Sequence, residues 1–90
     1  MLSIKILGFY HPFMDKIEEH TRTAMGWLQP HAGYQIEKVT DTAEIKSYTD
    51  KSLGLIINNK IVSEGQIPPV GEVITWASDA LQTALENREH

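Results

Sequence analysis

The chain has 90 residues, of which 41% are hydrophobic and 22% charged, and it contains no cysteine. This length accommodates one domain, and the composition is typical of a folded globular protein. Eight basic against twelve acidic residues give a net charge of −4, which excludes the basic field that attracts nucleic acids or anionic membranes. Because the chain has no thiol, it cannot form disulfides, thiolate metal sites or cysteine nucleophiles. Since no apolar run approaches the ~18 residues of a membrane span and no secretory signal pattern is present, we expect a cytoplasmic chain with no membrane partner.

The first two predicted elements are a strand and a long helix. Apolar residues at positions 2, 4 and 6 alternate with polar ones, which predicts a strand over Leu2–Gly8. Pro12 suits the first turn of a helix, and apolar residues then recur at helical spacing, so a helix is predicted over residues 12–29. Trp27 here and Trp76 in the last helix fall at or beside such apolar stripes, where an indole usually belongs to the core or to a packed interface.

The middle of the chain predicts a strand, a short helix and a second strand. Tyr34–Val39 shows the mixed alternation of an edge strand. Asp41 followed by Glu44 has the form of a capping box, which predicts a short helix to about Tyr48. Leu53–Ile57 is apolar at every position, as in a central strand that is covered on both faces.

The last part of the chain predicts a hairpin and a helix. Asn58-Asn59 can adopt the positive φ of a tight turn, and Lys60–Glu64 is then the antiparallel partner strand. After Pro68-Pro69, one apolar helix face is predicted, followed by a frayed tail over residues 87–90; the face comprises Val70, Val73, Ile74, Ala77, Ala80, Leu81, Ala84 and Leu85. With right-handed crossovers, the order β-α-β-α-β-β-α predicts an α/β fold with a four-stranded mixed sheet and helices on both faces.

Four short segments carry a resemblance to a known family. They are G-F-Y-H-P-F-M at residues 8–14, E-K-V-T-D at 37–41, I-N-N-K-I-V at 57–62 and S-E-G-Q-I-P at 63–68. Together they make the chain similar to the minimal thioredoxin-like proteins of the small redox-active disulfide or glutaredoxin-like type. The resemblance covers nearly the whole chain and implies one thioredoxin-like domain over residues 1–90.

The chain departs from that family at the two elements its chemistry requires. His11 and Met14 stand at the two cysteine positions of the family's C-P-x-C motif, and Ser52-Leu53 stands where the family has a cis-proline. A non-proline cis bond costs ~2.5–4 kcal/mol, so the Ser52–Leu53 peptide is predicted to be trans. Thiol–disulfide exchange needs a thiolate, which neither imidazole nor thioether replaces. We therefore expect a redox-inactive member of this fold.

The apolar residues around the start of the first helix favour a contact function. The predicted binding surface comprises Phe9, Tyr10, His11, Pro12, Phe13, Met14, Ser52 and Leu53. Large apolar side chains on a surface loop mark interaction sites, which predicts a protein-interaction or assembly module that binds a protein partner or a second copy of itself. In the alternative arrangement, Phe13 begins the buried helix stripe and Phe9 folds under the loop, which leaves Tyr10 and Met14 exposed.

A second functional hypothesis places a small-molecule or soft-metal site at the same helix start, centred on His11. Imidazole and thioether are suitable ligands for Cu(I), so Met14 would be the other ligand. His20 lies roughly 13 Å further along the helix axis and cannot complete the site. The sequence shows no acid, base and nucleophile that converge on one place, so we predict neither an enzymatic activity nor a resident cofactor. The acidic residues of the first helix are expected to form a solvated face.

Overall fold

The computed structural model describes residues 1–9, 11–30 and 33–88, with the side-chain surroundings of residues 11 and 84–88 left out. The elements are β1 (Leu2–Gly8), α1 (His11–Leu28), β2 (Tyr34–Val39), α2 (Thr42–Tyr48), β3 (Leu53–Ile57), β4 (Lys60–Glu64) and α3 (Val70–Arg88). They follow the predicted order and form one four-stranded mixed sheet, so the predicted α/β class is confirmed.

The sheet has the strand order β2-β1-β3-β4. β1 and β2 are parallel, with Ile4 opposite Ile36, and α1 provides the crossover that a parallel pair needs. β3 is antiparallel to both of its neighbours, β1 and β4. Every residue of β3 is buried, as predicted for a central strand, and β2 and β4 form the two edges.

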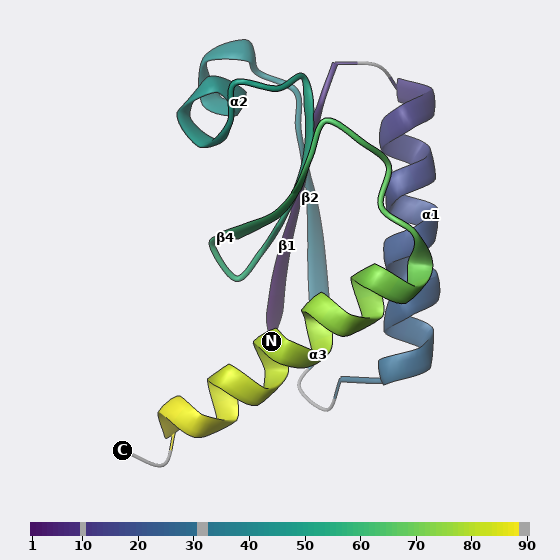
Figure 1. The fold of residues 1–90 in the computed structure, drawn as a ribbon, viewed down its shortest axis with the longest axis vertical. Coiled ribbons are helices and arrows are strands. Elements are labelled where there is room, and N and C mark those ends of the chain that lie inside the picture. Colours follow the sequence, from purple (N-terminus) through teal and green to yellow (C-terminus); the bar gives the residue numbers. More distant parts are fainter. Residues whose placement is uncertain (10, 31–32, 89–90) are drawn as a thin grey trace.

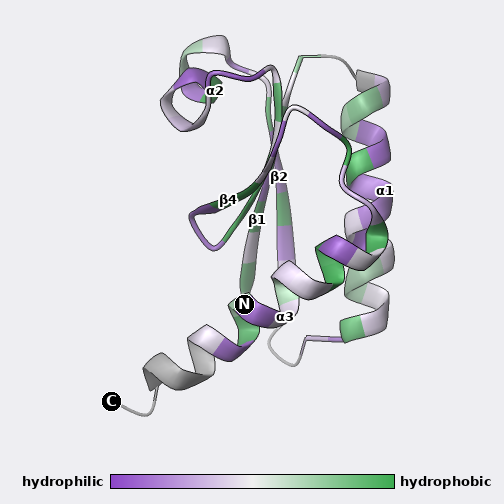
Figure 2. Cartoon of the chain, viewed as in Figure 1, coloured by the Kyte–Doolittle hydropathy of each residue, from purple (hydrophilic) through white to green (hydrophobic). Residues whose placement is uncertain are grey.

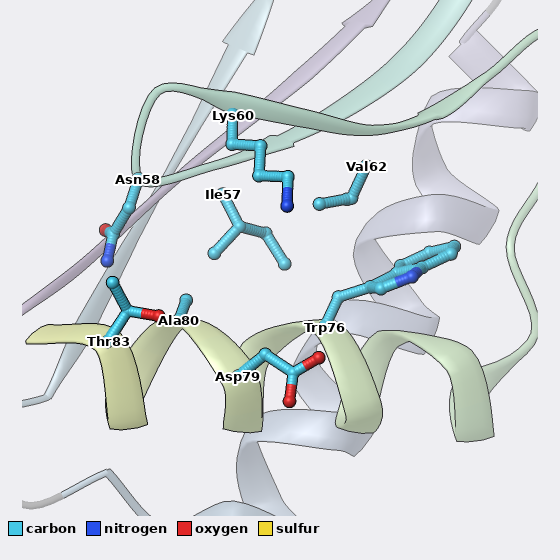
Figure 3. Close-up of a pocket in the computed structure, with 8 residues that line it drawn as sticks. All are labelled: Ile57, Asn58, Lys60, Val62, Trp76, Asp79, Ala80 and Thr83. Carbon is cyan, nitrogen blue, oxygen red and sulfur yellow. The ribbon is translucent and has the colours of Figure 1, made fainter.

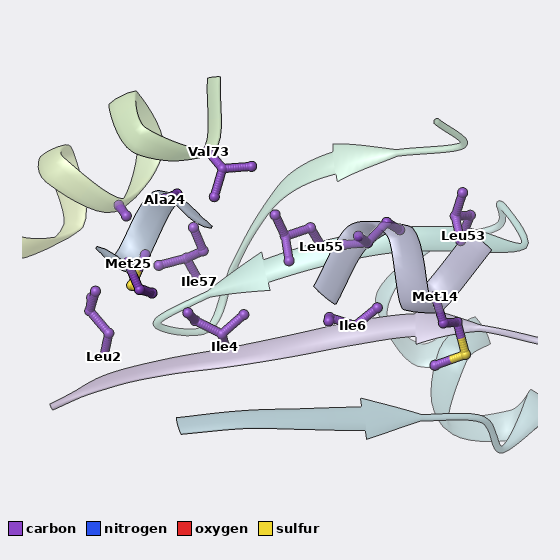
Figure 4. Packing of buried hydrophobic residues seen from close by; sticks show 12 residues of the cluster. Leu2, Ile4, Ile6, Met14, Ala24, Met25, Leu53, Leu55, Ile57 and Val73 are labelled. Carbon is purple, nitrogen blue, oxygen red and sulfur yellow. The ribbon is translucent and has the colours of Figure 1, made fainter. Parts of the chain in front are cut away.

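The sheet separates two hydrophobic clusters. α1 and α3 cover one face and α2 lies over the other (Figure 1). Successive side chains of a strand point to opposite faces, so Ile6 belongs to the cluster under α1 and α3, whereas Leu7 belongs to the one under α2. The main cluster contains Leu2, Ile4, Ile6, Met14, Ile17, Ala24, Met25, Leu53, Leu55, Ile57, Val73 and Ala77 (Figure 4). In Figure 2 the hydrophobic residues follow the strands and the hairpin turn is hydrophilic.

Local signals set the short helix and the hairpin. The Asp41 carboxylate accepts a hydrogen bond from the Glu44 backbone N–H at 3.2 Å, which confirms Asp41 as the cap of α2. Asn58 and Asn59 have φ values of 50° and 67°, the left-handed pair of a two-residue hairpin turn. The Asn58 side-chain oxygen also accepts from the Ser3 N–H at 3.0 Å, which ties the hairpin to β1.

Two predictions about the helices are wrong. Trp27 is 76% exposed, because the inner stripe of α1 continues four residues after Ala24 at the half-buried Leu28 instead. α3 extends to Arg88, so residues 87 and 88 are helical and not a frayed tail. No glycine or proline follows Gly71, so no helix breaker ends α3 earlier. Trp76 packs against the main cluster as predicted. Within the described ranges, no helix is long and apolar enough to cross a membrane.

Candidate functional site

The predicted binding surface lies where β1 ends and α1 begins. Gly8 pairs with Leu53, so this end of β1 is next to the first residue of β3. Phe9, Phe13, Ser52, Leu53 and Gly65 line a hollow of about 180 Å³ at this place, which we call the aromatic hollow. Four of these residues come from the two segments that the sequence predicted to meet, and Gly65 was not anticipated.

Met14 and Leu53 pack tightly around Gly8 beneath the aromatic hollow. A Cβ atom on Gly8 would lie 2.9 Å from Met14 Cγ and 3.2 Å from Leu53 Cδ1, so only glycine fits here without displacement. Met14 has no exposed surface, and Leu53 is also buried (Figure 4). The residues at the second cysteine position and the proline position of the resembled family thus belong to the hydrophobic core.

The rim of the aromatic hollow consists of two half-exposed phenyl rings. Phe9 is 48% and Phe13 is 47% exposed. The alternative arrangement, with Phe13 in the core and Met14 outside, is therefore wrong. The buried residues of α1 are Met14, Ile17, Thr21, Ala24 and Met25, and they occupy one side of the helix. Position 13, four residues before Ile17, lies at the edge of this stripe, and its ring stays half-exposed.

The connection before β3 completes the wall of the aromatic hollow. None of the described peptide bonds is cis, so the Ser52–Leu53 bond is trans, as predicted. The Leu53 carbonyl accepts a hydrogen bond from the Gly65 N–H at 2.7 Å. Gly65 has φ of 72°, a left-handed conformation that favours glycine. This bond holds the segment after β4 against the start of β3.

Charged side chains of α1 pair with one another and with β2. Lys38 on β2 lies 3.0 Å from Asp15 and 2.9 Å from Glu18, and Arg22 lies 2.8 Å from Glu18. Hydrogen bonds from Lys38 and then Arg22 lower the pKa of Glu18, and the bonds to Glu18 and Asp15 raise the pKa of Lys38. Part of the face predicted to be solvated therefore connects α1 to β2, and Glu18 is held as a carboxylate instead of a proton donor.

The histidines give no metal centre among the described residues. His20 Nδ1 lies 2.8 Å from the Pro68 carbonyl oxygen, so His20 ties α1 to the segment before α3. No group of three His, Cys, Asp or Glu side chains that could hold a metal ion occurs in the part of the chain that the structure describes. Tyr10 and the side chain of His11 lie outside the described residues, and Pro12 is exposed. The His11-centred hypothesis stays a prediction.

The lining of the aromatic hollow supports binding better than catalysis. Among the described residues that line it, the only side-chain polar group is the Ser52 hydroxyl, and none of them is charged. No family model, curated protein or solved structure matches this chain.

A second hollow, which the sequence analysis missed, lies between the β3–β4 hairpin and α3. Its volume is about 280 Å³, and Trp76, Asp79 and Ala80 of α3 line one side of it. The sequence signal was present, because these three residues are spaced by three and four positions and share one face of the helix. We call this hollow the hairpin pocket.

Proposed function

We propose that this chain is a redox-inactive protein with a thioredoxin-like fold that binds a protein partner, or a second copy of itself, at the aromatic hollow. The four-stranded mixed sheet with helices on both faces, and the position of residues 8–14 at the junction of β1 and α1, support the thioredoxin-like assignment. The absence of cysteine excludes thiol–disulfide exchange. What remains at the equivalent place is an apolar contact surface.

The observation that carries the proposal is the exposure of Phe9 and Phe13 around an apolar hollow. Each ring leaves about half of its surface in water, although the core lies directly beneath at Met14 and Leu53. Burial of a large apolar side chain contributes about 1.5–3 kcal/mol, so covering the exposed half of both rings contributes about 2 kcal/mol to binding. Exposed apolar surface that gathers at one place is typical of an interaction site.

The size of the aromatic hollow indicates what the partner inserts. A cavity of about 150 Å³ accommodates one benzene molecule, so about 180 Å³ accepts one large apolar side chain. A partner segment that places a single Phe, Leu or Met side chain between the two rings would fill it. This arrangement matches the anchor residues that dominate protein interfaces.

The test begins with the oligomeric state and continues with the isolated partner. Light scattering after size exclusion shows whether the chain associates with itself; if it is monomeric, a partner captured from cell extract is purified and its dissociation constant is measured. The double variant Phe9→Ala, Phe13→Ala is expected to weaken the association at least tenfold, which corresponds to about 1.4 kcal/mol.

The matched control is Trp27→Ala, which removes another exposed aromatic side chain from the same helix. Met14 is left unchanged, because its buried side chain supports the core and its loss would destabilise the fold. If the double phenylalanine variant and the Trp27 variant bind equally well, the aromatic hollow is not the contact surface. A chain that neither self-associates nor captures a partner would contradict the proposed function.

A further inference from the structure

The hairpin pocket has an apolar floor between two elements. Lys60 and Ile57 are opposite each other in the β3–β4 pair, so both lie on the face toward α3, and Val62 follows two residues later. From the other side, Trp76 and Ala80 of α3 complete the floor (Figure 3). Ile57 is fully buried, whereas Trp76, Ala80 and Val62 are half-buried and leave apolar surface open to a ligand.

Two opposite charges that have no partner among the described side chains stand at the rim of this pocket. Lys60 projects from the hairpin and Asp79 from the helix (Figure 3). Neither forms an ion pair or a side-chain hydrogen bond within the described ranges, and they do not pair with each other. By contrast, Lys5, Lys16, Arg22 and Lys38 all have acidic partners. The rim therefore places one cation and one anion, both unpaired among the side chains that the structure describes, on opposite walls.

We infer that the hairpin pocket binds a free α-amino acid with an apolar or aromatic side chain. Its carboxylate would pair with Lys60 and its ammonium group with Asp79, and its side chain would cover Val62 and Trp76. A ligand of this class carries both charges and no net charge, which matches the rim. A ligand with a single charge would use only one of the two groups.

The volume fits this class of ligand. The pocket of about 280 Å³ exceeds the roughly 150 Å³ that accommodates a benzene ring, and the remaining space suits the charged head of the amino acid. Small-ligand sites typically combine an apolar lining with a few polar groups that fix the orientation. The inference is independent of the function proposed for the aromatic hollow.

Trp76 is the reporter for the binding experiment. In a Trp27→Phe background it is the only tryptophan, and Trp27 is exposed, so its replacement leaves the core intact. Titration with L-phenylalanine to millimolar concentrations is expected to give a saturable change in Trp76 emission, with matching shifts of the Val62 and Ala80 amide signals in NMR spectra. 3-Phenylpropionate lacks the ammonium group and phenethylamine lacks the carboxylate; both are expected to bind at least fivefold more weakly.

Variants locate the site. Lys60→Met and Asp79→Asn are each expected to weaken phenylalanine binding by about fivefold, the upper range for a solvent-exposed ion pair. The matched controls Lys46→Met and Glu72→Gln remove the same charges from exposed positions outside the pocket and are expected to bind unchanged. The Phe9→Ala, Phe13→Ala variant is also expected to bind phenylalanine with unchanged affinity, because the ring of the ligand does not enter the aromatic hollow.

Four results would overturn the inference. They are the absence of a saturable change, binding of either single-charge analogue as tight as that of phenylalanine, insensitivity to both Lys60→Met and Asp79→Asn, and loss of binding in the Phe9→Ala, Phe13→Ala variant. The variants alter exposed side chains, and far-ultraviolet circular dichroism verifies that each one is folded.

Discussion

Gly8→Ala tests the packing beneath the aromatic hollow. The added Cβ would lie 2.9 Å from Met14 Cγ and 3.2 Å from Leu53 Cδ1, whereas carbon atoms prefer a separation of about 3.5–4.0 Å. Both neighbours are buried and cannot move into solvent. Forcing an extra methyl group into a packed core costs typically about 1–3 kcal/mol. The loss of conformational freedom in the unfolded chain offsets about 0.4–1 kcal/mol of this cost, so we expect a net destabilisation of about 1–2 kcal/mol.

Gly26→Ala is the matched control, because it makes the same chemical change where space is free. Gly26 lies within α1, and a Cβ there would meet nothing within 4 Å. Alanine in a helix is more favourable than glycine by about 0.8–1 kcal/mol, so this variant should be more stable than the wild type. The two substitutions are therefore expected to shift the free energy of unfolding in opposite directions.

Urea unfolding, followed by circular dichroism, measures both variants. For a domain of this size, 1 kcal/mol also shifts Tm by about 4–8 °C, which gives a second measurement of the same difference. If Gly8→Ala stabilises the protein as Gly26→Ala does, Met14 and Leu53 do not close on Gly8 and the floor of the aromatic hollow is open.

Three further variants address other parts of the structure. Ser63 Oγ is buried without a hydrogen-bond partner within the described part of the chain, so Ser63→Ala is expected to raise the free energy of unfolding by about 1 kcal/mol in urea titrations; a loss of stability would show that the hydroxyl is satisfied. Hydrogen bonding, first from Lys38, lowers the pKa of Glu18 below its ordinary 4.5. The ionised Glu18 therefore stabilises the folded state fully above pH 4.5, and this contribution is lost as the pH falls through the lowered pKa. Glu18→Gln should therefore lower the free energy of unfolding by less than about 1 kcal/mol at neutral pH, and it should make that free energy less dependent on pH in acid. If urea unfolding curves of the variant and the wild type coincide at every pH, the pairing of Glu18 with Lys38 and Arg22 does not contribute to stability. His11→Cys, Met14→Cys should form an internal disulfide on mild oxidation, detected by mass spectrometry, because residues three apart at a helix start lie within bridging distance; a folded variant that stays reduced would contradict the thioredoxin-like placement of this segment.

The secondary structure could be predicted because its signals are local. The alternation in Leu2–Gly8, the cap at Asp41 and the Asn58-Asn59 turn each depend on a few neighbouring residues, and all three appear in the structure at the predicted places. Uniform hydrophobicity in Leu53–Ile57 likewise predicted a strand that is buried on both faces. The end of α3 was less predictable, since a helix without a breaker has no local stop signal.

The candidate site could be predicted only in part. The family resemblance implied that residues 8–14 and Ser52-Leu53 meet, and Phe9, Phe13, Ser52 and Leu53 do line one hollow. It did not decide which side chains face outward. Phe13 and Met14 are adjacent and both hydrophobic, and on a helix adjacent positions differ by about 100° in direction. The sheet beneath α1 selects Met14 for the core and leaves Phe13 at the surface.

By itself, the sequence determined the order of the elements, the turn residues and the absence of thiol chemistry, because propensity, capping and composition act over short distances. Only the tertiary structure decided that Lys38 pairs with Asp15 and Glu18, and that Lys60 and Asp79 stand on opposite walls of a pocket. These relations join residues about twenty positions apart in the chain. They depend on how the helices are placed against the sheet, and that placement is fixed by the sum of many weak packing contacts that no short segment encodes.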